Sequence, residues 1–249
     1  MIKKQIYRYI GFLLLVQTLL FSADFKTITF PASDGVTITA DLYMSHTDTK
    51  TPFIVLFHQA ASSRGEYREI APKLNKLGFN AMAIDQRSGD GMNDVDNDTV
   101  MDALEKDKEI QYLDALVDLK SALSYVKEQY AKGKVMGWGS SYSAALILKV
   151  AGDDPTIVDG VVAFSPGEYF TPRVVVKDSA KHITVPTFIT STRKEQKKTK
   201  PIFDVISSKK TYFLPKTEGD HGSKALWKKF KEHQAYWNGV EEFLKQFRE

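Results

Sequence analysis

Two adjacent serines stand among small residues in the stretch GWGSSYSAAL, directly after an apolar run. A serine can act as a nucleophile from a sharp turn between a strand and a helix if the residues two before and two after it are small, because larger side chains would collide. Ser141 meets this condition with Gly139 and Ser143. Ser140 does not, because aromatic residues occupy both positions. The spacing therefore predicts that Ser141 is the nucleophile.

A serine hydroxyl is a weak nucleophile until a base removes its proton, and the base needs a carboxylate that holds its tautomer. We expect His221 to be the base, because it stands in the polar stretch EGDHGSKALW between the last expected strand and the terminal helix. We expect Glu195 to be the acid, because it follows the expected strand at 187–191 and because nucleophile turns of this type are followed by the acid and then the histidine. Glu195 also has basic neighbours, as a solvated charge would, and Asp204 and Asp220 are the alternative acids.

The tetrahedral intermediate of such a reaction needs N–H donors for its oxyanion. One is the backbone N–H of the residue after the nucleophile, which is Tyr142, and the other comes from the loop after the third strand. That loop reads HQAASS, and we expect Ala60 to be the donor, with Gln59 as the next choice. We expect His58 to be buried and hydrogen-bonded to this loop.

The aromatic residues Trp138, Tyr169 and Phe170 are candidates for the lining of a substrate pocket, although aromatic residues in such a region serve core packing about equally often. Only the short segment 166–183 separates the sixth and seventh strands. Any lid is therefore minimal, which favours a small, open pocket.

A calcium site is disfavoured in the acidic stretch GDGMNDVDNDTVMDALEKDKE, although its aspartates alternate as they do in calcium-binding loops. The glycine and the glutamate that such loops carry at their sixth and twelfth positions are missing. We expect a solvated acidic loop, no metal and no cofactor. The chain also has no cysteine, which excludes disulfides and a thiolate nucleophile.

Strand-like and helix-like patterns alternate along the chain and predict the elements that hold these residues. Continuous apolar runs such as FIVLF are typical of parallel strands that are covered on both faces. The expected strands are residues 25–30, 36–43, 53–57, 80–85, 134–138, 160–165, 187–191 and 210–215. Helical spacing is expected around 67–79, at 116–130, after the serine turn, and at the C-terminus as one helix or as two broken at 238–239. The pattern predicts an α/β fold with a mostly parallel twisted sheet of about eight strands, helices on both faces, and the site at the carboxyl ends of the strands.

The N-terminus has the layout of a secretory signal, with basic residues first, then the apolar stretch 10–21 and small residues at 22–23. The apolar stretch is shorter than the ~20 residues that a membrane span needs. We therefore expect residues 1–23 to be a signal peptide, residues 24–249 to be a single domain, and the protein to be exported to the periplasm or secreted. An uncleaved anchor is the alternative. The net charge of +3 includes the basic residues of the signal, and nothing points to nucleic acid as a partner.

The chain resembles the α/β-hydrolases, and among them the small dienelactone-hydrolase-like and esterase-like members. The resemblance is carried, in this order, by FPASDGVTITADLY, VLFHQA, AIDQRSGDG, GSSYSAAL and GDHG, which together extend over nearly the whole expected mature chain. Gln59 stands where many relatives have glycine, and Glu195 stands where aspartate is commoner. The resemblance implies a serine hydrolase of small carboxylic esters or lactones that works through an acyl-enzyme. An envelope acyltransferase with the same acyl-enzyme and a non-catalytic binding protein are the alternatives.

Overall fold

Continuous apolar runs form the centre of the sheet, because these strands are buried on both faces. The computed structural model describes residues 25–170 and 172–248. Within them, the strands are β1 (Lys26–Pro31), β2 (Thr37–Tyr43), β3 (Phe53–Phe57), β4 (Asn80–Ile84), β5 (Val135–Ser140), β6 (Gly160–Phe164), β7 (Thr187–Thr190) and β8 (Lys210–Phe213). Every residue of β3 to β7 is buried. All eight expected strands are therefore present, with ends shifted by no more than two residues.

The eight described strands form one sheet in the order β1-β2-β4-β3-β5-β6-β7-β8. β1 and β2 pair as an antiparallel hairpin, β2 is antiparallel to β4, and every later pairing is parallel. The order changes direction at β3, which lies between β4 and β5. In open sheets of this kind, ligands bind beyond the carboxyl ends of the strands near such a point.

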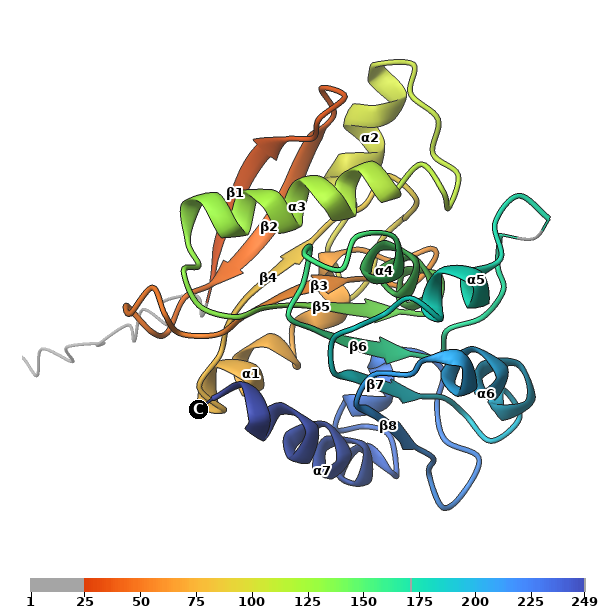
Figure 1. Cartoon of the computed structure of the whole chain (residues 1–249). Helices are drawn as coiled ribbons and strands as arrows, with labels where there is room; N and C mark the ends of the chain where they lie inside the picture. Colours follow the sequence, from red (N-terminus) through yellow and green to blue (C-terminus); the bar gives the residue numbers. More distant parts are fainter. Residues whose placement is uncertain (1–24, 171, 249) are drawn as a thin grey trace, which may run out of the picture.

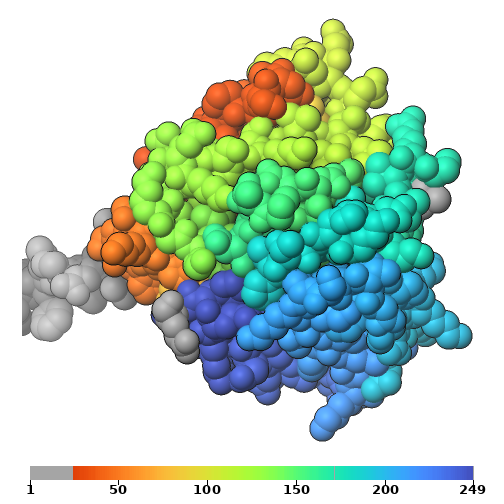
Figure 2. All heavy atoms as spheres, in the orientation of Figure 1, coloured from red at the N-terminus to blue at the C-terminus, as the bar shows by residue number. Residues whose placement is uncertain are grey.

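Helices cover both faces of the sheet (Figure 1). The α-helices are α1 (Ala71–Lys76), α2 (Asp98–Glu105), α3 (Leu116–Gln129), α4 (Tyr142–Asp153), α5 (Val176–Ala180), α6 (Gln196–Val205) and α7 (His233–Leu244), and the 3-10 turns are η1 (Arg64–Tyr67), η2 (Ser223–Leu226) and η3 (Lys245–Phe247). Residues of β3 alternate between two cores, with Phe57 packed among α3 and α4 and Leu56 among α1 and α7. Figure 2 shows side chains of the segments from α3 to α6 covering one of these faces.

The structure contains helices that the sequence patterns did not predict. The acidic stretch, which we expected to be a loop, includes α2, and the side chain of Asn97 caps this helix by accepting the N–H of Val100. α5 and α6 follow β6 and β7. The terminal helix α7 runs through Asn238 and Gly239 without a break.

The predicted signal segment at 1–23 lies outside the described residues. Among the residues that are described, no helix combines the length and the apolar character needed to cross a membrane.

Candidate active site

The turn between β5 and α4 holds Ser141 in an unusual backbone conformation, with φ at 58° and ψ at −119°. Such a left-handed conformation is strained for a residue with a side chain and is kept where the surrounding structure enforces it. A Cβ on Gly139 would lie 2.3 Å from the carbonyl oxygen of Ser143, so only glycine fits two residues before the serine. This turn brings the Ser141 side chain to the carboxyl edge of the sheet.

Ser141, His221 and Glu195 form a continuous hydrogen-bonded chain. Ser141 Oγ lies 2.8 Å from His221 Nε2. His221 Nδ1 is hydrogen-bonded to Glu195 Oε1. Because an ionised carboxylate can only accept, the proton is on Nδ1, and Nε2 is left to accept the hydroxyl hydrogen of Ser141. This arrangement can transfer a proton from the serine hydroxyl to the imidazole.

Glu195 is held by further donors at the start of α6. Its Oε2 accepts the hydroxyl of Ser165 at 2.9 Å and the backbone N–H of Thr192 at 3.1 Å. Burial favours the neutral form of Glu195, but the hydrogen bond and the charge of His221, together with these donors, lower its pKa to about 2. The carboxylate is therefore ionised at neutral pH.

The two alternative acids lie elsewhere. Asp204 pairs with Lys200, one turn earlier on α6, and both side chains are exposed. Asp220 precedes His221 in the chain, and its backbone N–H is 3.4 Å from the hydroxyl of Tyr236. Glu195 is the carboxylate that the structure brings to His221.

Of the three N–H groups expected as oxyanion donors, two are free to donate and one is already hydrogen-bonded. The backbone N–H groups of Tyr142 and Ala60 make no hydrogen bond within the described part of the chain. The expectation for Gln59 is wrong, because its N–H donates to the buried carboxylate of Glu66 at 2.7 Å. The N–H groups of Tyr142 and Ala60 are therefore the pair with free donor capacity.

Of the three aromatic residues proposed as pocket lining, two are buried and one is exposed. Trp138 is fully buried on the face of the sheet that α1 and α7 cover. Its ring stacks on Phe164, and its Nε1 donates to Ser223 Oγ at 2.9 Å. Phe170 is also buried, and it packs in the core next to α4. The assignment of Trp138 as pocket lining is therefore wrong, and Phe170 contributes mainly to the core.

Tyr169 is 41% exposed and lies beside the serine. Its hydroxyl donates to the carbonyl oxygen of Ser165 at 2.9 Å. Burial raises the pKa of Tyr169, and the nearby hydroxyl of Ser141 offsets part of this rise. Tyr169 also lines an open groove of about 320 Å³, together with Gln111, Tyr112, Leu113, Phe170, Pro172 and Arg173. Tyr112 stacks on the ring of Tyr142, with 4.6 Å between the centroids. This groove therefore has exposed aromatic rings, and through Tyr169 it reaches the surroundings of Ser141.

Ser143, which replaces the usual second glycine of the turn, belongs to a buried polar network under residues 58–63. This loop holds the expected oxyanion donor Ala60 and is called the oxyanion loop below. The hydroxyl of Ser143 donates to the carbonyl oxygen of His58 at 2.5 Å and accepts from Gln86 Nε2 at 2.9 Å. His58 is fully buried, as expected. Its Nδ1 is hydrogen-bonded to the carbonyl oxygen of Gln59, and its Nε2 accepts the N–H of Gln86. Burial lowers the pKa of His58 to about 4. This histidine is therefore neutral and holds the loop.

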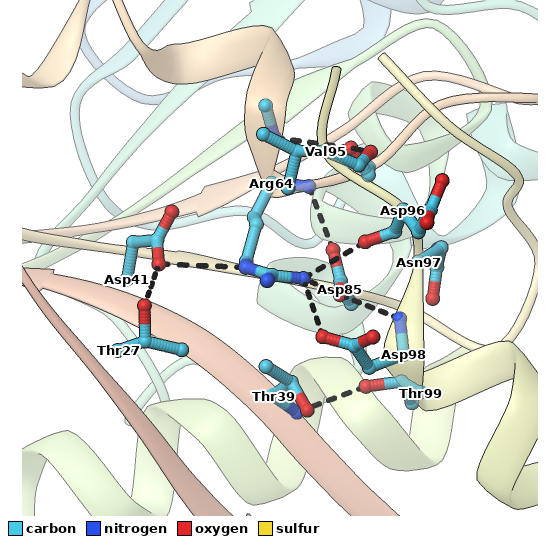
Figure 3. A network of polar contacts seen from close by, with 12 residues as sticks. Thr27, Thr39, Asp41, Arg64, Asp85, Val95, Asp96, Asn97, Asp98 and Thr99 are labelled. Atoms are coloured by element: carbon cyan, nitrogen blue, oxygen red, sulfur yellow. Dashed lines mark hydrogen bonds and ion pairs between the residues drawn. The ribbon is translucent and has the colours of Figure 1, made fainter. Parts of the chain in front are cut away.

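Arg64 fastens the far end of the oxyanion loop to the sheet (Figure 3). Its backbone N–H donates to Asp85 at 2.7 Å, and its guanidinium pairs with Asp85, with Asp41 on β2 and with Asp98 at the start of α2. A guanidinium donates in a fixed planar pattern, which suits such a shared position. The acidic stretch thus supplies a carboxylate to this network, and no cluster of metal-binding side chains is found in the described parts of the chain.

The comparison with protein families decides the assignment. The family model described as serine aminopeptidase, S33, matches residues 49–210, which is well over half of the chain. The chain belongs to this family. It is a hydrolase with the α/β-hydrolase fold, as the sequence motifs predicted. No curated protein sequence matches the chain.

Solved structures share the fold of this S33 family member at low sequence identity. An esterase from Pyrococcus furiosus has a TM-score of 0.68 at 18% identity, with 92% of this chain and 94% of that chain covered. A dienelactone hydrolase from Anabaena variabilis has a TM-score of 0.69 at 15% identity, with 91% and 100% covered. Acetyl xylan esterase 1 from a Thermoanaerobacterium species has a TM-score of 0.64 at 17% identity, with 88% and 83% covered.

The sequence reasoning missed several residues that the structure places around the site of this hydrolase. Ser165 directly follows β6 and contacts Glu195, and its position at a strand end was a usable signal. Glu66 and Arg64 gave no such signal, because charged residues in a turn are normally solvated.

Proposed function

We propose that this hydrolase is a serine esterase that cleaves small carboxylic esters or lactones through an acyl-enzyme. The observation that carries the proposal is the 2.8 Å contact between Ser141 Oγ and His221 Nε2, because it connects a hydroxyl at a strained turn to a base. The orientation of that base by Glu195 supports it further. The esterases and the dienelactone hydrolase among the solved structures of the same fold also support this reaction class for the chain.

The reaction follows from these positions. Ser141 Oγ attacks the ester carbonyl carbon while His221 takes the hydroxyl proton, and the N–H groups of Tyr142 and Ala60 stabilise the oxyanion. The bond to the alcohol breaks, and His221 gives its proton to the departing alcohol. Water then attacks the acyl-enzyme, with His221 again as base, and releases the acid and free Ser141.

The groove beside the serine favours a small substrate. Its volume of about 320 Å³ is at the lower end of the range for small-molecule sites. The exposed rings of Tyr112 and Tyr169 offer flat apolar surfaces to an acyl or alcohol group. We expect short acyl esters and small aromatic esters to be better substrates than long-chain lipids.

Labelling with a fluorophosphonate tests the nucleophile. The purified protein should be labelled, Ser140→Ala should still be labelled, and Ser141→Ala should not. Hydrolysis of p-nitrophenyl acetate should fall on the order of 10⁵-fold in Ser141→Ala. Absence of labelling in the unaltered protein would contradict the proposal and favour a binding protein.

Two competing activities are tested with the same protein. An aminopeptidase, as the family description suggests, would release p-nitroaniline from amino-acid p-nitroanilides faster than it cleaves p-nitrophenyl acetate. An acyltransferase would give more ester or amide product than acid when alcohols or amines are added as acceptors. We expect hydrolysis of the ester to dominate in both comparisons.

We also propose that the protein is exported and that residues 1–23 are removed. The basic start and the short apolar stretch support this. Mass spectrometry of the protein from the periplasm or medium should find a chain that begins near residue 23 or 24. A full-length chain in the membrane fraction would instead indicate an uncleaved anchor.

A further inference from the structure

Glu66 is a fully buried carboxylate that lies next to the proposed catalytic residues but is not one of them. It belongs to η1, the turn that follows the oxyanion loop. Its Oε2 accepts the backbone N–H of Gln59 at 2.7 Å, and its Oε1 accepts the hydroxyl of Ser140 at 2.7 Å. One side chain therefore joins the oxyanion loop to the residue just before the nucleophile.

Ser140 extends this connection to the loop that carries the base. Its Oγ accepts the backbone N–H of Ser223, two residues after His221, at 2.8 Å. Because Ser140 Oγ accepts this N–H, its own hydrogen is directed to Glu66. Gly222 lies so close that an added Cβ would be 2.6 Å from Ser140 Oγ. The oxyanion loop, the serine turn and the histidine loop thus meet at the Glu66–Ser140 pair.

The contacts fit a negatively charged Glu66. Both carboxylate oxygens accept hydrogen bonds, and neither contact requires a proton on the carboxyl group. Burial raises the pKa of Glu66 above its ordinary value, and the two donors and the nearby charges of Lys224 and His221 offset part of this rise. The arginines next to Glu66 in the chain form ion pairs with another carboxylate, because Arg64 and Arg68 both pair with Asp41.

We propose that Glu66 is a positioning residue that aligns the three loops of the site and whose charge stabilises the imidazolium form of His221 during acyl transfer. The proposal rests on the proposed esterase function. The bond from Gln59 N–H to Glu66 fixes the His58–Gln59 peptide, and this restrains the direction of the next N–H along the chain, that of Ala60, toward the oxyanion. A misplacement of about 1 Å at such a donor can cost about a hundredfold in rate.

The test is the pH dependence of kcat/KM for p-nitrophenyl acetate in Glu66→Gln. This change keeps the shape of the side chain but removes its charge and turns one acceptor into a donor. We expect kcat to fall about tenfold to a hundredfold with little change in KM, because the contacts that are lost act in the transition state. The acid limb of the profile should move to lower pH, because an imidazolium that keeps Glu195 but loses a second nearby negative charge gives up its proton more readily.

The matched control is Glu69→Gln, the same substitution at an exposed position one turn later. Its rate and profile should equal those of the unaltered protein. If Glu66→Gln has an unmoved acid limb, or a kcat within twofold of the unaltered protein, the proposal is overturned. A protein that is not labelled by fluorophosphonate at all would instead refute the esterase function, so the two failures are distinct.

The variant Ser140→Ala tests the same proposal if Glu66→Gln does not fold. This change removes the hydroxyl that links Glu66 to the serine turn and to the backbone of Ser223. It keeps the carboxylate and leaves no large cavity. We expect about tenfold lower kcat, retained labelling of Ser141 and an unmoved acid limb. In the double variant the two losses should not add, because both changes break one connection. An unchanged kcat in Ser140→Ala would overturn the positioning role.

Discussion

Ser165 donates its hydroxyl hydrogen to Glu195, with 2.9 Å between Oγ and Oε2. Ser165 Oγ also accepts the backbone N–H of Gly222 at 3.1 Å. Ser165 therefore holds both Glu195 and the loop that carries His221. Its φ of 54° shows that its backbone is strained to reach this position. Ser165 is therefore part of the support of the proposed triad, although its hydroxyl is hydrogen-bonded to Glu195 and Gly222 and not to His221.

Ser165→Ala should lower kcat/KM for p-nitrophenyl acetate by about tenfold, because one hydrogen bond to a charged group is worth ~1.5 kcal/mol. The buried N–H of Gly222 also loses its acceptor. Steady-state kinetics measure the effect, and a melting temperature close to that of the unaltered protein would attribute it to the site. Equal kcat/KM in the variant would mean that Glu195 is held adequately by its other donors.

Gly139→Ala should prevent the formation of the serine turn. The new Cβ would lie 2.3 Å from a backbone oxygen that cannot move without breaking the start of α4. We expect a loss of about 3 kcal/mol in the free energy of unfolding, measured by urea denaturation, together with the loss of labelling. Gly91→Ala is the control, because its Cβ would meet only ordinary contacts at 3.5 Å. Similar stability of the two variants would contradict this reading of the turn.

The strands and the proposed triad could be predicted because each leaves a local signal. Apolar runs mark buried strands, and the small residues around Ser141 mark a turn that only small residues permit. His221 and Glu195 followed from their places after expected strands. For each of these residues, the neighbours in the chain contain the relevant information.

Trp138, Phe170 and Glu66 could not be placed in this way. In a strand buried on both faces, apolar residues point to either side, so the pattern does not tell which face Trp138 occupies. Glu66 resembles any charged residue of a turn until Ser140, distant in the sequence, is seen beside it. The role of Gln59 depended on the same carboxylate, because the N–H of Gln59 donates to Glu66 and is directed away from the oxyanion.

His58 should make the stability of the protein depend on pH. Burial lowers its pKa from 6.5 to about 4, so between these values the unfolded chain binds more protons than the folded one. Stability from this group is complete above pH 6.5 and is lost as the pH falls toward 4, by up to about 3 kcal/mol. Urea unfolding at several pH values measures the slope. An imidazole of His58 that titrates near pH 6.5 by NMR would contradict the expectation.

The groove beside Ser141 should select for aromatic groups through Tyr112. Its exposed ring stacks on Tyr142 and can stack on a substrate ring in the same way. Tyr112→Ala should lower kcat/KM for p-nitrophenyl phenylacetate about fivefold more than for p-nitrophenyl acetate, since an aromatic pair contributes ~1 kcal/mol. Met101→Ala, which removes another exposed apolar side chain, should leave the ratio unchanged. An equal loss for both esters in Tyr112→Ala would show that this ring supports the turn through Tyr142 and does not contact the acyl group.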